Sequence, residues 1–139
     1  MSRKLKEINQ CRKLYHLSDT NHDGRTFYPR IPDSRLDDED DKHKRVCFSR
    51  TMSGCVKALY NHYYGYVDLY VHIPTNIDDV INHNGLYKPS NKLVPDVLST
   101  KEIWCTKPVK LKCIGFARFC MIDNDFNNKV KIKWLKKYN

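Results

Sequence analysis

The chain has 139 residues, 40% of them hydrophobic, and it carries a formal net charge of +9. This length predicts one domain with a hydrophobic core, and the lack of any apolar run of ~18–20 residues argues against a membrane-spanning helix or a membrane partner. The excess of positive charge favours polyanionic partners such as nucleotides and nucleic acid, and the charged first residues, without an apolar stretch, favour a cytosolic location over secretion.

Cysteine and histidine residues give no local signature of a disulfide framework or a metal site. The number of cysteines is even, but a chain of this length can form a core without disulfides, and most of its cysteines lie in apolar runs. No C-x-x-C or H-E-x-x-H spacing occurs, and the six histidines are scattered. We therefore expect buried, reduced thiols and no bound metal. The cysteines are Cys11, Cys47, Cys55, Cys105, Cys113 and Cys120.

The first third of the chain is predicted to hold two short strands separated by a long loop. Residues 1–11 are expected to form an N-terminal arm or a short helix, and residues 12–18 the first strand. Residues 19–44 are polar and rich in turn-forming residues, so we predict a long loop, which in a compact domain is often functional. Residues 45–49 have β-branched and aromatic side chains and predict the second strand.

The D-T-N-H-D-G segment at residues 19–24 matches the first half of an EF-hand calcium loop. The twelfth position of such a loop needs a bidentate carboxylate, but here it is Arg30. Pro29 and Pro32 also disfavour the exiting helix. Because Asp, Asn and Gly tolerate left-handed backbone and bond their own main chain, we predict a turn and not a calcium site.

The middle of the chain predicts one helix, one strand and a second irregular stretch. Residues 55–63 carry apolar side chains at helical spacing, and Thr51 or Ser53 would cap this helix. Residues 68–73 predict a strand that ends at a proline. Residues 75–98 contain Asn-Gly and two prolines and are expected to be irregular.

The last third is rich in predicted strands. Residues 102–105, 109–119 and 130–135 alternate or run apolar, and a turn at residues 123–125 joins the last two into a hairpin. Taken together, these elements predict a single α+β domain over residues 1–139. We expect a curved, mostly antiparallel sheet with one or two helices and two long loops.

Three separate segments place polar side chains at the ends of predicted strands. Tyr15-His16-Leu17-Ser18 ends the first strand, Phe48-Ser49 ends the second before Arg50-Thr51 and the helix, and Glu102 opens the strand in KEIWCTKPVKLK. This order resembles the ADP-ribosyltransferase-like fold, particularly its His–Tyr–Glu branch. Over about residues 14–119, the pattern also looks like small uncharacterised proteins of low-GC bacteria and their phages.

The resemblance implies a protein that binds NAD or a related nucleotide, and it leaves open whether ADP-ribose is transferred to a macromolecule. Glu102 would be the catalytic residue, stabilising the positive charge that develops as nicotinamide leaves. His16 would hydrogen-bond the ribose, and an arginine fork would suit the pyrophosphate. The implied cofactor-binding residues are His16, Ser18, Ser49, Thr51, Tyr60 (or Tyr63) and Arg45, with Arg50 and Lys88 as alternative cations.

Two non-enzymatic alternatives stay open, with His16 and Glu102 as ordinary polar residues at strand edges. Small size, positive charge and several tyrosines are typical of an interaction protein, such as a phage-encoded inhibitor of a host or defence protein. The basic C-terminus, together with Trp134, would instead suit nucleic acid, with an affinity that falls as salt is added. The residues concerned are Tyr60, Tyr63, Tyr64 and Tyr66 for the first alternative, and Lys129, Lys131, Lys133, Lys136 and Lys137 for the second.

Overall fold

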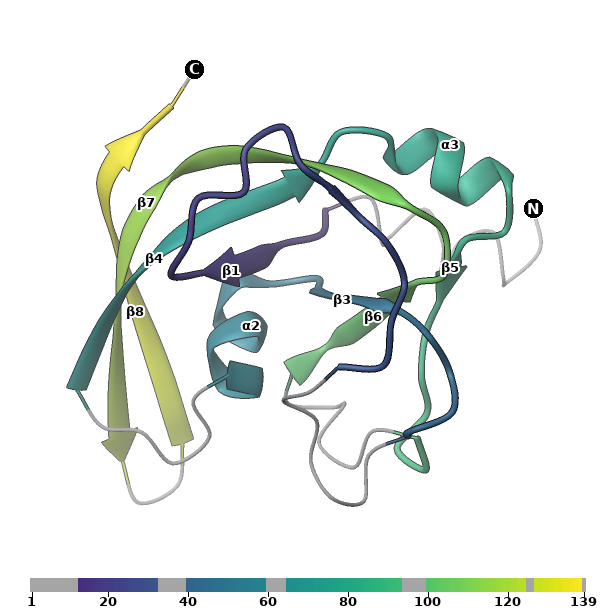
Figure 1. Cartoon of the computed structure of the whole chain (residues 1–139). Coiled ribbons are helices and arrows are strands. Elements are labelled where there is room, and N and C mark those ends of the chain that lie inside the picture. The colour runs from purple at the N-terminus through teal and green to yellow at the C-terminus, as the bar shows by residue number, and fades with distance from the viewer. Residues whose placement is uncertain (1–12, 33–39, 60–64, 94–99, 125–126, 139) are drawn as a thin grey trace, which may run out of the picture.

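The computed structural model describes residues 13–32, 40–59, 65–93, 100–124 and 127–138, and Figure 1 shows their arrangement. This part of the chain forms eight strands and two short helices. In chain order they are β1 (His16–Ser18), β2 (Thr26–Phe27), β3 (Val46–Ser49), α2 (Met52–Leu59), β4 (Gly65–Pro74), α3 (Ile77–Asn82), β5 (Leu86–Tyr87), β6 (Glu102–Cys105), β7 (Val109–Asn124) and β8 (Asn127–Lys137).

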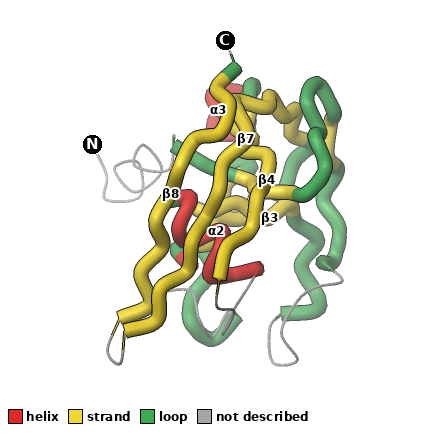
Figure 2. Tube along the Cα trace, turned by 90° about the vertical axis from the view of Figure 1, so that its left-hand side faces the viewer, coloured by secondary structure: helices red, strands yellow, loops and turns green. Residues whose placement is uncertain are grey.

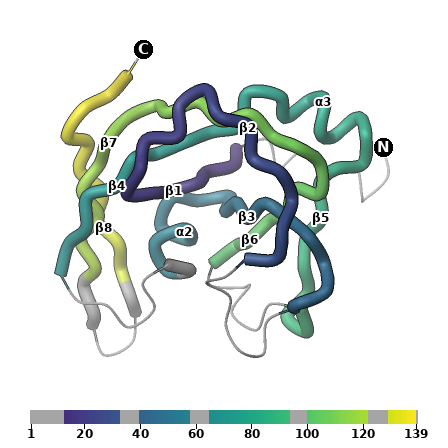
Figure 3. Tube along the Cα trace, viewed as in Figure 1, coloured from purple at the N-terminus to yellow at the C-terminus, as the bar shows by residue number. Residues whose placement is uncertain are grey.

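The described strands form two antiparallel sheets. In the larger sheet the strands follow the order β1-β4-β7-β2, and β8 also pairs with β7; the smaller sheet has the order β3-β6-β5. An isolated bridge between Tyr15 and Ser49 connects the first strand to the smaller sheet. The long strands β4 and β7 arch over the molecule, and α2 lies beneath them on the concave side (Figure 1). Figure 3 shows β1 lying between β4 and β3 under this arch.

The arch encloses two hydrophobic clusters, one on each side of β1. Leu14 belongs to the first cluster and Leu17 to the second, because side chains three residues apart on a strand point to opposite faces. The buried members of the first cluster are Leu14, Val46, Phe48, Val80, Ile103, Cys105, Val109 and Leu111. Those of the second, which include two side chains of α2, are Leu17, Cys55, Val56, Leu69, Val71, Ala117 and Phe119.

The predicted α+β class with a mostly antiparallel sheet is confirmed, and so is the final hairpin, because β7 and β8 pair from Gly115–Lys137 to Asn124–Asn127. The expectation that residues 75–98 are irregular is wrong in part, because this range contains α3 and β5. Both elements are too short for periodicity to reveal. The long loop predicted at residues 19–44 likewise contains β2, whose two residues pair with β7 far along the chain.

The D-T-N-H-D-G segment forms a turn, as predicted. Asn21 accepts a hydrogen bond from the Asp23 backbone N–H at 2.9 Å, and Gly24 has a φ of +76°, which glycine adopts without strain. The Asp23 carboxylate accepts the backbone N–H of Cys113 at 2.9 Å. Its oxygen therefore fixes the turn to β7. Among the described helices, none is long and apolar enough to cross a bilayer.

Candidate functional site

Two of the predicted site residues lie opposite each other on neighbouring strands. Ser49, the last residue of β3, is the register partner of Glu102, the first residue of β6. Tyr15 pairs with Ser49 on the other side, with backbone hydrogen bonds of 2.8 and 3.0 Å. Tyr15, directly before β1, therefore forms one row with Ser49 of β3 and Glu102 of β6, although the three lie far apart in the sequence.

His16 does not share the face of this row. Directly opposite residues of antiparallel strands project to the same side, so Tyr15, Ser49 and Glu102 share a face and His16, next to Tyr15, projects to the other. Its ring lies 5.4 Å from the ring of Phe27 and 6.0 Å from that of Phe48, within the first hydrophobic cluster. The structure thus brings Ser49 and Glu102 together and separates His16 from them.

The hydroxyls of Ser49 and Thr51 form hydrogen bonds that stabilise the first turn of α2. The buried Ser49 hydroxyl donates to the backbone oxygen of Thr100 at 2.6 Å and accepts the Thr51 N–H at 3.2 Å. The Thr51 hydroxyl accepts the Gly54 N–H at 3.0 Å, so of the two predicted caps, Thr51 and Ser53, it is Thr51 that caps the helix, which begins at Met52 and not at residue 55. These hydroxyls have structural partners. Tyr60, also implied as a cofactor-binding residue, lies outside the described residues.

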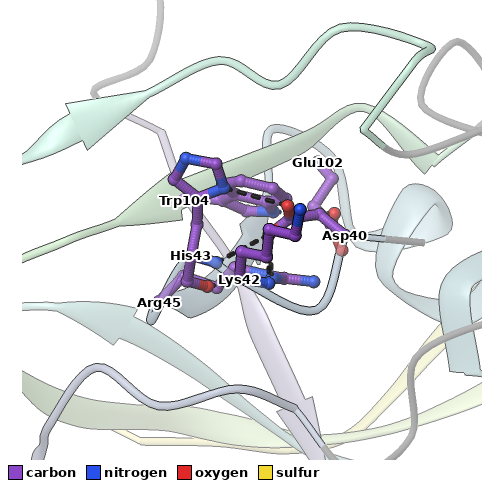
Figure 4. A network of polar contacts seen from close by, with 6 residues as sticks. All are labelled: Asp40, Lys42, His43, Arg45, Glu102 and Trp104. Atoms are coloured by element: carbon purple, nitrogen blue, oxygen red, sulfur yellow. Dashed lines mark hydrogen bonds and ion pairs between the residues drawn. The ribbon is translucent and has the colours of Figure 1, made fainter.

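The Glu102 carboxylate belongs to a polar network centred on Trp104 (Figure 4). Glu102 Oε2 accepts the indole Nε1–H at 2.9 Å, so one oxygen of the half-buried carboxylate has a fixed position. The guanidinium of Arg45 lies over the same indole, 4.1 Å from its centroid, and the Tyr87 ring stacks on it at 5.7 Å. Trp104 itself is only 1% exposed, so the network rests on a rigid, buried side chain.

Arg45 occupies the interior of the protein, although the resemblance implied a role in binding the pyrophosphate. The side chain donates to Asp40 Oδ2 at 3.0 Å and to the backbone oxygen of His43 at 2.9 Å, and the residue is 1% exposed. A buried cation needs such partners because an unpaired charge inside a protein is very costly. Its position makes Arg45 a structural residue that holds the segment before β3 against Trp104.

Three histidines that the sequence leaves scattered come together beside β1. The ring centroids of His16, His22 and His72 are 5.5–6.4 Å apart. The Nε2 atom of His72 accepts the His22 backbone N–H at 2.9 Å, while its Nδ1 donates to the His16 backbone oxygen at 3.1 Å, so His72 must be neutral to keep both bonds. Burial lowers the pKa of all three rings, to about 4 for His16.

Ser18, the remaining predicted cofactor residue, belongs to the turn after β1. Its hydroxyl oxygen lies 3.1 Å from His22 Nε2 and accepts the Thr20 N–H at 3.1 Å. Across the described ranges, no group of three or more His, Cys, Asp or Glu side chains is arranged to hold a metal ion. The histidine cluster therefore connects β1, β4 and the following turn through hydrogen bonds and ring contacts.

A second candidate site lies on the convex surface of β4, β7 and β8, which we call the outer face. Register pairing aligns its side chains in three rows across the three strands, and in each row the β8 member is a lysine. Figure 2 shows these strands in front, with α2 behind them and no described segment covering them. The rows are Tyr66–Cys120–Lys131, Asp68–Arg118–Lys133 and Tyr70–Phe116–Lys136.

The outer face combines positive charge with aromatic rings. The one acid in these three rows, Asp68, accepts two hydrogen bonds from Arg118 at 2.8 and 3.0 Å, and this arginine lowers the pKa of the carboxyl. The Arg118 guanidinium also lies 4.3 Å from the centroid of Tyr66, which is 57% exposed. In the next row, the rings of Tyr70 and Phe116 lie 4.6 Å apart. Four cations against one acid give this surface a net positive charge.

Sequence reasoning named the C-terminal lysines but missed their neighbours on the outer face. It paired the lysines with Trp134, and Lys137 Nζ does lie 5.5 Å from the centroid of this ring, but the ring packs against the second hydrophobic cluster on the inner side of the sheet, away from the three lysines of the outer face. The alternation along β7 could have identified these neighbours, because the buried Ala117 and Phe119 alternate with Phe116, Arg118 and Cys120, which face outward. The register that places tyrosines of β4 beside them depends on long-range pairing.

Comparison of the chain with protein-family models, with curated proteins and with solved structures finds no match. The function must therefore be inferred from the two candidate sites themselves.

Proposed function

We propose that this protein binds nucleic acid in the cytosol through the outer face of β4, β7 and β8. The observation that carries this proposal is the alignment of Lys131, Lys133 and Lys136 beside a row of aromatic and arginine side chains on an uncovered sheet surface. Lysine and arginine neutralise backbone phosphates and release their counterions, which supplies most of the sequence-independent affinity. The net charge of +9 adds long-range attraction to any polyanion.

The proposal is tested by fluorescence anisotropy with a labelled 20-nucleotide oligonucleotide in increasing KCl. We expect the logarithm of the affinity to fall linearly with the logarithm of the salt concentration, with a slope set by the number of phosphates contacted. The double substitution Lys131→Glu and Lys133→Glu should weaken binding at least tenfold at about 0.1 M salt. Both side chains are exposed, so the fold should survive.

The matched control is Lys88→Glu with Lys92→Glu. These lysines are also exposed, but they follow the small strand β5 and lie outside the rows of the outer face. The change in net charge is the same, so any loss caused by total charge alone would be equal in both variants. Equal losses, or oligonucleotide affinity independent of salt, would contradict binding through the outer face.

A second candidate function is an NAD-binding site at Glu102, supported by the row of Tyr15, Ser49 and Glu102 on adjacent strands. A half-buried carboxylate held by Trp104 Nε1 suits hydrogen bonding to a ribose or stabilisation of an oxocarbenium-like state. In this candidate Tyr15, not His16, would share the ligand's side of the sheet. Asp41 is an exposed acid and provides a matched control for Glu102.

Thermal unfolding with 1 mM NAD tests this candidate, because a ligand that binds only the native state must raise the Tm. We expect Glu102→Gln to abolish the shift, together with any release of nicotinamide, and Asp41→Asn to retain both. A wild-type Tm that NAD does not change would eliminate the candidate without affecting the nucleic-acid proposal.

A further inference from the structure

We infer that the outer face takes a single-stranded nucleic acid, with phosphates along β8 and unpaired bases stacked on the aromatic row of Tyr70 and Phe116. This inference rests on the proposed function and specifies the ligand class of the same site. It follows from the order of chemical groups across the three strands: lysines on β8, then Phe116 and Arg118 on β7, then tyrosines on β4.

The lysines of the three rows form a column along β8 that can contact the phosphates of the ligand. Lys131 and Lys133 project from the same side of β8, about 7 Å apart, because side chains two residues apart share a face of a strand. Lys136 continues the column after an irregularity in the pairing with β7. Among the described strands, β8 pairs with β7 alone, so the ligand can approach the lysines along an outer strand of the sheet.

The aromatic rings of Tyr70 and Phe116 lie beside this lysine column, where bases of the ligand can stack on them. Tyr70 and Phe116 are half-buried, so their positions are fixed while part of each ring faces outward. Their rings meet at 37°, and Lys136 Nζ lies 5.6 Å from the ring of Tyr138, which extends the aromatic surface toward the C-terminus. Aromatic rings that face outward from a sheet beside cations are the arrangement on which successive bases of a single strand stack.

The same rings argue against a duplex as the preferred ligand. In a duplex the faces of the bases are already stacked on one another, so a flat ring on the protein surface gains contact only if the duplex is unstacked at an energetic cost. The Asp68–Arg118 pair also suits unpaired bases. It presents a carboxylate and a guanidinium between Tyr66 and the aromatic row, where they can reach the polar edges of a splayed base.

The test compares three labelled probes of equal length: oligo(dT), an oligonucleotide of abasic sites, and a duplex. We expect wild-type protein to bind oligo(dT) at least fivefold more tightly than either other probe, because stacking on one base commonly changes affinity by about that factor or more. Phe116→Leu should remove most of this preference while leaving affinity for the abasic probe unchanged. Tyr28→Leu is the control, because Tyr28 is 68% exposed and lies outside the outer face.

The outcomes separate this inference from the proposal on which it rests. Equal affinity for oligo(dT) and the abasic probe, or tighter binding of the duplex, would overturn the single-strand inference but leave phosphate binding intact. Failure of all three probes to bind would overturn both. Should Phe116→Leu lower the Tm, the more exposed Tyr66→Leu tests the neighbouring row, with the same loss of oligo(dT) preference expected.

Discussion

At the scale of single residues, the histidine cluster shows how burial converts a titratable side chain into a structural one. His16 donates from Nδ1 to the Cys47 backbone oxygen at 3.3 Å and packs against Phe27 and Phe48. Charging this ring would place an ion among aromatic side chains, close to two other histidines. Burial accordingly lowers the pKa of His16 to about 4 from an ordinary value of 6.5.

The lowered pKa predicts a loss of stability in mild acid. Between pH 6.5 and about 4 the unfolded chain binds a proton at His16 that the native chain does not, so the free energy of unfolding falls as the pH falls through this window. The shift corresponds to a loss of about 3 kcal/mol from His16 by pH 4, and His72, whose pKa is also lowered, adds to it. Urea unfolding at pH 7.0, 5.5 and 4.5 measures the effect.

Two variants identify the source of this pH dependence. His16→Gln removes the titrating ring, so its free energy of unfolding should change less between pH 7.0 and 4.5 than that of the wild type, whatever its value at pH 7. His83→Gln alters an exposed histidine, whose side chain is 67% accessible, and should retain the wild-type dependence. Identical slopes in all three proteins would show that other groups control acid stability.

At the scale of elements, the first turn of helix α2 packs very closely against the backbone of Thr100 and the side chain of Ser49. A Cβ atom at Gly54 would overlap the Thr100 backbone oxygen and the Ser49 hydroxyl, the two atoms that form the 2.6 Å hydrogen bond behind the helix. Glycine is normally unfavourable inside a helix by about 1 kcal/mol relative to alanine. Glycine is needed here because a side chain would collide with this hydrogen bond, which the helix must approach to bury Val56 against the sheet.

We therefore expect Gly54→Ala to destabilise the protein although alanine is the better helix former. Overlap with backbone atoms costs about 1–3 kcal/mol in a packed interior, which exceeds the gain in helix propensity. Denaturant unfolding should show a net loss, with the far-ultraviolet spectrum of the native state retained. Ser53→Ala, one residue earlier, should be neutral or slightly stabilising. A stabilised Gly54→Ala variant would mean that α2 can move away from Thr100.

The elements that local pattern predicted are those whose side chains alternate or repeat over several residues. Strands β6, β7 and β8 and helix α2 all contain such patterns, and residue type alone named Thr51 or Ser53 as the cap, of which the structure has Thr51. Strand β2 and helix α3 were missed because two to six residues carry too little periodicity. Their positions depend on partners such as Lys110, which lies far away in sequence.

The candidate sites were predictable to different degrees for the same reason. The order of strand ends led to Ser49 and Glu102, which are indeed register partners. The face on which His16 lies could not be read from its position at a strand end, since neighbouring residues of a strand point to opposite sides. The lysines of β8 were evident from the sequence, whereas Tyr70 and Arg118 joined them only through pairing of distant strands.

At the scale of the whole molecule, positive charge is concentrated where the proposed ligand would bind. Arg118 and Lys133 lie directly opposite each other in the β7–β8 register, with Lys131 and Lys136 in the adjacent rows. Like charges on opposing positions of a sheet repel, and within the three described rows Asp68 is the single acid that offsets them. This repulsion makes the outer face electrostatically unfavourable on its own, and a bound polyanion would relieve it.

This charge distribution predicts that salt has opposite effects on folding and on binding. Between about 0.02 and 0.3 M KCl, screening should weaken the repulsion and raise the Tm of the free protein by a few degrees, while oligonucleotide affinity falls. Lys133→Glu should raise the Tm at low salt and flatten its salt dependence, because it places an acid opposite Arg118. Lys92→Glu makes the same change in net charge outside the outer face and should have a smaller effect. A wild-type Tm that decreases with KCl would show that attractive ion pairs outweigh this repulsion.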